Sequence, residues 1–138
     1  MSDPVQPLAG CCILVVEDEY LIAMDVKRWL MAAGATVAGP VPSVNQALDI
    51  LKENRLTAAV LDINLGNGDT VYPVAAELNA LGVPYIFATG DVNLLNANDC
   101  RDHLRLNKPY LEVELVRALA ELVLGSKPRP KEDPPRFR

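Results

Sequence analysis

Three carboxylates, one hydroxyl group and one ammonium group in this 138-residue chain each lie at the end of a short, mostly apolar run. In chain order, these residues are Glu17, Asp18, Asp62, Thr89 and Lys108. Two like charges about 4 Å apart repel by about 4 kcal/mol at an effective dielectric near 20, so gathered carboxylates must take up protons or bind a cation. Lys108 offsets one charge. A hard divalent ion such as Mg²⁺, which prefers oxygen ligands, would offset the rest.

The same groups suit phosphoryl transfer, a reaction to which a protein contributes mainly positioning and charge neutralisation. The carboxylate of Asp62 could act as a nucleophile and form an aspartyl phosphate. The hydroxyl of Thr89 and the ammonium of Lys108 could each bind a phosphoryl oxygen. For any one of these residues, solvation of a strand end is the simpler explanation, so the prediction depends on the whole set.

The apolar runs predict the strands of a parallel sheet, because strands buried on both faces have short continuous apolar sequences. Helical patterns separate the runs, which is typical of a doubly wound α/β fold. The predicted strands are 13–16, 36–41, 58–61, 85–88 and 103–107. Ligands bind at the carboxyl ends of such strands, so the five polar residues should converge there. Pro40 indicates that the second strand lies at an edge, since proline cannot donate to a central ladder.

Local signals mark where several of the intervening helices begin and end. Gly34 is placed where the first helix should end. Ser43 and Gln46 form a capping box that opens the second helix. Pro73 is compatible with the first turn of the third. The clearest helical pattern of all covers about 110–124, close to the end of the chain.

The polar residues and the Lys108-Pro109 dipeptide, in this order and at these spacings, resemble the receiver domain of two-component response regulators. The resemblance runs from about the first strand to the last helix. It implies a flavodoxin-like fold, with a five-stranded parallel sheet in the order 2-1-3-4-5 flanked by five helices. The run Phe87-Ala88-Thr89-Gly90 is also similar to the motif of an atypical receiver subgroup, FATGUY, named for that run.

The resemblance implies a metal site at the end of the sheet. Asp18 and Asp62 would bind Mg²⁺ directly, or Mn²⁺ in its place. Asn64 would bind it through the backbone carbonyl, and Glu17 would take a more water-mediated part. It further implies a cis peptide bond between Lys108 and the proline that follows.

The resemblance also implies a phosphorelay role. Asp62 would accept the phosphoryl group from a phosphohistidine on a sensor histidine kinase or phosphotransfer protein, assisted by Thr89 and Lys108. Hydrolysis would then reset the chain, which would signal through contacts with a downstream protein target. Because this phosphotransfer and autodephosphorylation are self-directed, the chain is expected to be a signalling phosphoprotein and not an enzyme.

The chain departs from the usual receiver pattern at Arg105, three residues before the lysine. An aromatic residue normally stands there and reports phosphorylation by rotating, and the FATGUY subgroup is similar to this chain in lacking it. The segment 91–102 has the weakest helix signal, because its three asparagines are poor helix formers. We expect this segment to be the fourth helix and the mobile part of the switch.

Charge and composition limit the partners and the location. The net charge is −5, but residues 126–138 carry +3, which leaves −8 for residues 1–125. An acidic body argues against direct binding of nucleic acid. No apolar run reaches the roughly 18 residues of a membrane span, and residues 1–10 do not read as a signal peptide, so a cytoplasmic protein is expected. Three cysteines and one histidine form neither a disulfide framework nor a zinc spacing.

The expected organisation is one receiver domain, without an attached output domain, between two tails. Residues 1–9 are expected to be a flexible tail, residues 10–125 the receiver domain, and residues 126–138 a disordered, proline-rich basic tail.

Two other functions remain open. One is a phosphorylation-independent binding module that keeps only the fold. The other is a phosphohydrolase similar to the haloacid dehalogenases, which also form an aspartyl phosphate. That family has a second aspartate two residues after the nucleophile, where this chain has Asn64.

The last helix has more apolar surface than a sheet needs to cover it. Leu111, Leu115, Leu119 and Leu122 supply one apolar stripe, which is enough for packing on a sheet. Val113, Val116, Ala120 and Val123 form a second stripe with no evident core to bury it. An additional apolar stripe usually marks a protein interface, so self-association or partner binding is expected there.

Overall fold

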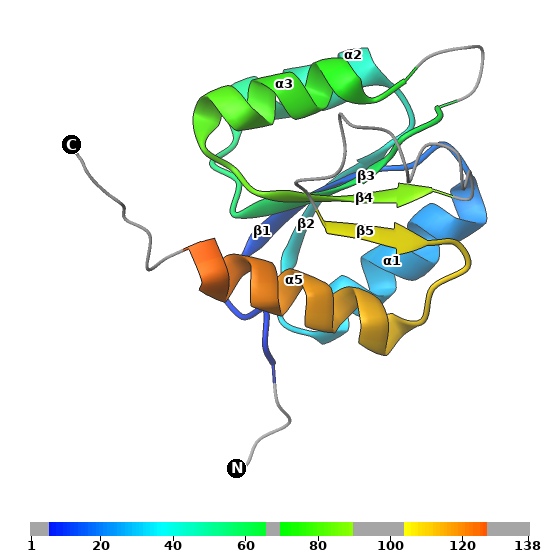
Figure 1. Ribbon diagram of the computed structural model, residues 1–138, viewed down its shortest axis with the longest axis vertical. Helices are drawn as coiled ribbons and strands as arrows, with labels where there is room; N and C mark the ends of the chain where they lie inside the picture. The colour runs from blue at the N-terminus through cyan, green and yellow to red at the C-terminus, as the bar shows by residue number, and fades with distance from the viewer. Residues whose placement is uncertain (1–5, 66–69, 90–103, 127–138) are drawn as a thin grey trace, which may run out of the picture.

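The computed structural model describes residues 6–65, 70–89 and 104–126. Within these ranges the chain forms one parallel sheet covered by helices on both faces (Figure 1). The predicted fourth helix, at 91–102, and most of the predicted C-terminal tail lie outside the described residues.

The sheet has five strands, all parallel, in the order β2-β1-β3-β4-β5. Their bounds are Cys12–Val16 for β1, Thr36–Val41 for β2, Ala58–Asp62 for β3, Tyr85–Thr89 for β4 and Leu104–Asn107 for β5. This order confirms the prediction. It also confirms the edge position of β2, which contains Pro40.

The described helices form the two outer layers. Their bounds are Tyr20–Ala32 for α1, Val44–Glu53 for α2, Tyr72–Leu81 for α3 and Glu112–Ser126 for α5. Helices α2 and α3 cover one face of the sheet, and α1 and α5 cover the other (Figure 1). No described helix is long and apolar enough to cross a bilayer.

The helix ends follow from local chemistry. The backbone N–H of Gln46 donates to the hydroxyl oxygen of Ser43 at 3.3 Å, as the capping box predicts. Pro73 lies in the first turn of α3. Glu114 caps the start of α5: its Oε1 accepts a hydrogen bond from the backbone N–H of Leu111 at 2.8 Å.

The core lies on both sides of the sheet. In β1, Ile13 and Val15 pack with α1 and α5, whereas Leu14 and Val16 pack with α2 and α3. Both sets are buried. A central strand buried on both faces has no polar side to alternate with, which explains its continuous apolar sequence.

The residues just before β1 differ from the expected flexible tail. Leu8 is fully buried, and its backbone N–H donates to the carbonyl oxygen of Ala33 at 3.0 Å. The turn formed by this segment passes so close to Gly34, whose φ is +101°, that a side chain there would meet Gln6 and Ala9 at 3.0 Å. Residues 6–9 therefore close the end of the core beside α1, and Gly34 permits the approach.

Helix α5 corrects two expectations about its stripes. Leu115 and Leu119 are fully buried, as predicted, but Leu111 precedes the helix and is 65% exposed. The second stripe is not without a core, because Val116 and Ala120 are partly buried against the α1 side of the sheet. Leu111 is exposed because the helix begins only at the next residue, Glu112. Val116 and Ala120 are partly buried because α5 packs on the sheet with a face that is broader than one leucine stripe.

Candidate functional site

The strand register brings the predicted acidic residues to one edge of the sheet. Val16 of β1 pairs with Leu61 of β3, so the next residues, Glu17 and Asp62, stand beside each other. Asp18 follows Glu17 directly. Each of the three offers a carboxylate oxygen, and these oxygens all lie within 4.8 Å of one another. The predicted cluster therefore exists in the folded chain.

Burial distinguishes the three carboxylates. Glu17 and Asp62 are each 5% exposed, whereas Asp18 is exposed to solvent. The backbone N–H of Glu19 donates to Oε2 of Glu17 at 3.2 Å, which helps to fix that side chain. The cluster thus has two buried carboxylates, and that of Asp18 forms its solvent-exposed side.

Lys108 enters the cluster from the end of β5. Its ammonium nitrogen lies 3.0 Å from Oε1 of Glu17 and 3.3 Å from Oδ2 of Asp62. The peptide bond between Lys108 and Pro109 is cis, as predicted. One positive charge is therefore shared by two nearly buried carboxylates, and Asp18 adds further negative charge close by.

The pKa of Asp62 reflects its burial first and the neighbouring negative charge second. Burial, followed by the charge of Glu17, raises the pKa of Asp62 from 3.8 to about 8, although Lys108 acts in the opposite direction. The pKa of Lys108 is raised: burial acts to lower it, but Glu17 and Asp62 outweigh that effect. The site favours a protonated Asp62 unless a further cation supplies positive charge.

Asn64 and Thr89 are placed by their backbones. Asn64 lies two residues after Asp62 and forms an isolated antiparallel bridge with Thr70. Thr89 is the last residue of β4 and pairs with Asn107 of β5, so it ends at the same edge of the sheet as Asp62. The side chain of Thr89 is outside the described part of the structure.

Two residues near the lysine were not among the predicted site residues. Oε1 of Glu19 lies 3.8 Å from the Lys108 ammonium nitrogen, and a third acidic residue after β1 was the signal that could have indicated it. Tyr110 is buried, and its ring makes an edge contact with Trp29 of α1 at a centroid distance of 6.3 Å. Burial, with smaller effects of Glu17 and Asp62, raises the pKa of the Tyr110 hydroxyl.

A cavity of about 300 Å³ adjoins the lysine between α1 and the loop that precedes α5. Glu19 and Asp25 supply acidic groups to its wall, and Trp29 and Tyr110 supply aromatic ones. Lys108, which pairs with the carboxylate cluster, therefore also lines this cavity.

The donor set fits a hard divalent cation. All three candidate ligand atoms are carboxylate oxygens, the type of ligand that Mg²⁺ and Mn²⁺ bind. Two of the carboxylates are buried with too little positive charge to balance them. A divalent ion would remove that imbalance of charge. The exposed carboxylate of Asp18 would be accessible to an ion that binds from solvent.

Phe87, Ala88 and Thr89 of the Phe-Ala-Thr-Gly run lie on β4. Phe87 is 2% exposed and makes edge contacts with Tyr72 and Tyr85 at centroid distances of 5.9 and 5.3 Å. Its register partner on β5 is Arg105. The phenylalanine of the run is therefore part of the core between the sheet and α3.

No protein-family model matches the chain. The curated protein phyllosphere-induced regulator PhyR of Methylorubrum extorquens is 34% identical over 79 residues, which are 56% of this chain. That match spans only 30% of PhyR.

Two solved structures extend the comparison to almost the whole chain. The solution structure of SdrG from Sphingomonas melonis Fr1 is 37% identical, with a TM-score of 0.73. The match covers 89% of this chain and 99% of SdrG. The receiver (REC) domain of the Erythrobacter litoralis PhyR response regulator matches with a TM-score of 0.78 and 23% identity, over 91% of this chain and 98% of that domain. The chain therefore belongs to the receiver-domain family of response regulators.

Proposed function

We propose that this chain is a response regulator receiver that accepts a phosphoryl group on Asp62 in a Mg²⁺-dependent phosphorelay. The observation that carries the proposal is the meeting of Asp62 with Glu17, Asp18 and Lys108 at the carboxyl edge of the sheet. Three carboxylates and one ammonium in that position form a site for a divalent cation and a phosphoryl group.

Asp62 is the nucleophile in this proposal. An oxygen of its carboxylate forms a bond to phosphorus while the bond between phosphorus and a donor histidine nitrogen breaks, and the histidine nitrogen keeps the electron pair. The reaction needs Asp62 without its proton, and a bound Mg²⁺ supplies the positive charge that favours this form. Asp18 and Asp62 would hold the ion directly, with the backbone carbonyl of Asn64, and Glu17 would act through water.

Lys108 and Thr89 bind the transferred group. The ammonium of Lys108 already touches Asp62 at 3.3 Å, so it can pair with an oxygen of a phosphoryl group attached there. Its contact with Glu17 keeps it in place during this change. Thr89 ends the neighbouring strand, from which its hydroxyl would donate to another phosphoryl oxygen.

The partners follow from the same proposal. The donor is a sensor histidine kinase or a phosphotransfer protein, and the output passes to a downstream protein target in the cytoplasm. The PhyR relatives are named as regulators, and one solved relative, from Bartonella quintana, is described as an anti-anti-sigma factor. The run Phe87–Gly90 and the arginine at position 105 support placement in the FATGUY subgroup.

Beryllofluoride, which mimics an aspartyl phosphate, tests the proposal without a kinase. We expect fluorine NMR to show a protein-bound beryllofluoride signal when Mg²⁺ is present and none after its removal by chelation. Asp62→Asn should abolish the signal, whereas the matched variant Asp49→Asn, on the exposed side of α2, should keep it. A bound signal in the Asp62→Asn protein would show that the nucleophile has been assigned wrongly.

A further inference from the structure

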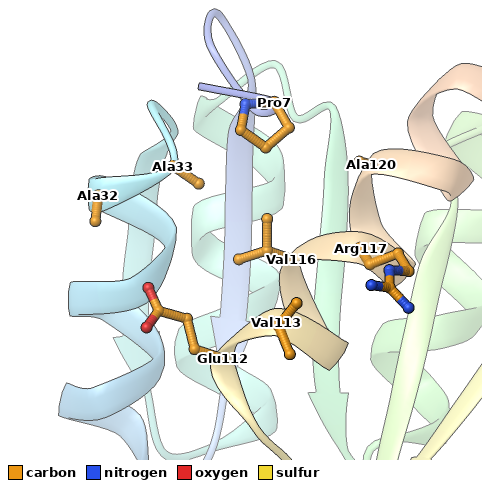
Figure 2. A pocket seen from close by; sticks show the side chains of 8 residues that line it. All are labelled: Pro7, Ala32, Ala33, Glu112, Val113, Val116, Arg117 and Ala120. Atoms are coloured by element: carbon orange, nitrogen blue, oxygen red, sulfur yellow. The ribbon is translucent and has the colours of Figure 1, made fainter. Parts of the chain in front are cut away.

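A second hollow lies on the helical face formed by α1 and α5, away from the carboxylate cluster. Its volume is about 510 Å³. Figure 2 shows the side chains that line it. Its apolar lining comes from the end of α1, the N-terminal segment and the first half of α5: Pro7, Ala32, Ala33, Val113, Val116 and Ala120. The two charged residues that line it, Glu112 and Arg117, both belong to α5.

The apolar residues of α5 on this side recur at heptad spacing. Val113, Val116, Ala120 and Val123 are separated by three, four and three residues, the pattern of the a and d positions of a coiled coil. Val113 is 55% exposed, and Val116 and Ala120 are only partly buried by the chain's own core. The small side chain of Ala120 leaves room for another helix to approach closely.

We call Val113, Val116, Ala120 and Val123 the α5 seam. The two charged residues beside the seam carry opposite charges. Glu112 precedes the first seam residue and so occupies a g position, while Arg117 occupies the following e position. Figure 2 shows their charged ends pointing to opposite sides of Val113 and Val116. Both residues are exposed, and among the described residues neither makes an ion pair.

This arrangement matches a second copy of the same helix in parallel orientation. In a parallel pair, the g position of one helix faces the e position five residues later on the other. Glu112 would then meet the arginine of the second copy, and by two-fold symmetry the reverse contact would form as well. In an antiparallel pair, g faces g and e faces e, so like charges would oppose each other. The charge pattern therefore favours the parallel pair.

We propose that the groove between α1 and α5 is the interface of a parallel homodimer, in which the α5 seams of two copies pack against each other. The second copy fills each groove with its own Val113 and Val116. The interface lies on the face of the sheet opposite α2 and α3.

The test is sedimentation equilibrium of the full chain up to about 1 mM, with reversal of the flanking charges. Each of Glu112→Arg and Arg117→Glu should weaken dimerisation by about tenfold, because each places two like-charged pairs across the interface. The double variant should return to roughly the wild-type association constant. An equimolar mixture of the two single variants should form a heterodimer. Glu121→Arg, on the same helix but outside the groove, is the matched control and should dimerise normally.

An apolar variant gives a second readout that does not depend on charge pairing. Val113→Lys should weaken dimerisation by at least about tenfold, since it puts an ammonium group in the seam. Leu81→Lys, at the equally exposed end of α3, should not. Circular dichroism of each variant would confirm the fold. A wild-type chain that stays monomeric throughout, or single charge reversals that the double variant does not rescue, would overturn the proposal.

Discussion

The ammonium nitrogen of Lys108 lies 3.0 Å from one carboxylate oxygen of Glu17 and 3.2 Å from the other, although the two residues are 91 positions apart in the chain. Both side chains are largely buried. The ion pair therefore connects the end of β1 to the loop after β5. Because Lys108 also pairs with Glu17, its positive charge does not balance Asp62 alone. Burial first, and then the charge of Glu17, raise the pKa of Asp62 although Lys108 lies close to it.

The first prediction concerns the pKa of Asp62 in the metal-free chain. Glu17→Gln removes the neighbouring charge that, after burial, contributes most to the raised pKa of about 8. We expect the pKa of Asp62 to fall by roughly one unit or more. Carbon-13 NMR titration of the Asp62 carboxyl group measures it. Glu77→Gln on α3 is the control, and an unchanged Asp62 titration in Glu17→Gln would refute the electrostatic explanation.

The second prediction concerns stability. With a raised pKa, folded Asp62 keeps its proton at pH values where the unfolded chain has lost it. The folded state then binds more protons, so this group makes folding less favourable as the pH rises from about 4 to about 8. Asp62→Asn should raise the free energy of unfolding of the metal-free chain by on the order of 2 kcal/mol at pH 8, and by much less near pH 4.

Urea denaturation at the two pH values, with a chelator present, measures this difference. Adding Mg²⁺ should reduce the advantage of the Asp62→Asn variant, because the ion stabilises the wild-type site by binding it. An asparagine variant that is less stable than wild type at pH 8 without metal would contradict the prediction.

The third prediction ranks the metal ligands. Asp18 is exposed at the open side of the cluster, whereas Glu17 is already paired with Lys108 at 3.0 Å. Asp18→Asn should therefore weaken Mg²⁺ binding by about tenfold or more, and Glu17→Gln should weaken it less. Isothermal titration calorimetry with Mg²⁺ would measure both. The reverse ranking would show that Glu17 is a direct ligand and Asp18 is not.

The fourth prediction uses the single tryptophan of the chain as a reporter. Trp29 touches the ring of Tyr110, which follows the Lys108-Pro109 peptide directly. A change in the position of Lys108 on binding Mg²⁺ or beryllofluoride should alter this contact and therefore the fluorescence of Trp29. Tyr110→Leu should remove most of the response while ligand binding persists. If Trp29 emission is the same with and without both ligands, the two rings do not sense the site.

Much of the site could be predicted from the sequence because its residues stand at the ends of buried strands. The position of Asp62 at the end of a fully buried run is sufficient to place it at the carboxyl edge, and the same holds for Glu17 and Asp18 after β1. The capping box at Ser43 and the edge position of Pro40 depend only on local backbone chemistry, and both were predicted correctly.

Features that depend on tertiary packing could not be predicted in the same way. The sequence does not show that Glu17, and not Asp62 alone, holds Lys108, because that contact joins segments 91 residues apart. The burial of Leu8 depends on the packing of residues 6–9 beside the end of α1, and the exposure of Leu111 depends on where α5 begins. The groove beside Val113 is lined by the end of α1 as well as by α5, two segments far apart in the sequence.

Intact-mass spectrometry measures directly whether Asp62 accepts a phosphoryl group. The full chain is incubated with acetyl phosphate, with Mg²⁺ or with a chelator, and compared with Asp62→Asn and the control Asp49→Asn. We expect a gain of one phosphoryl group for wild type and Asp49→Asn with Mg²⁺ only, and no gain for Asp62→Asn. A wild-type mass that never changes, or a phosphoryl group that Asp62→Asn still takes up at the normal rate, would contradict this expectation.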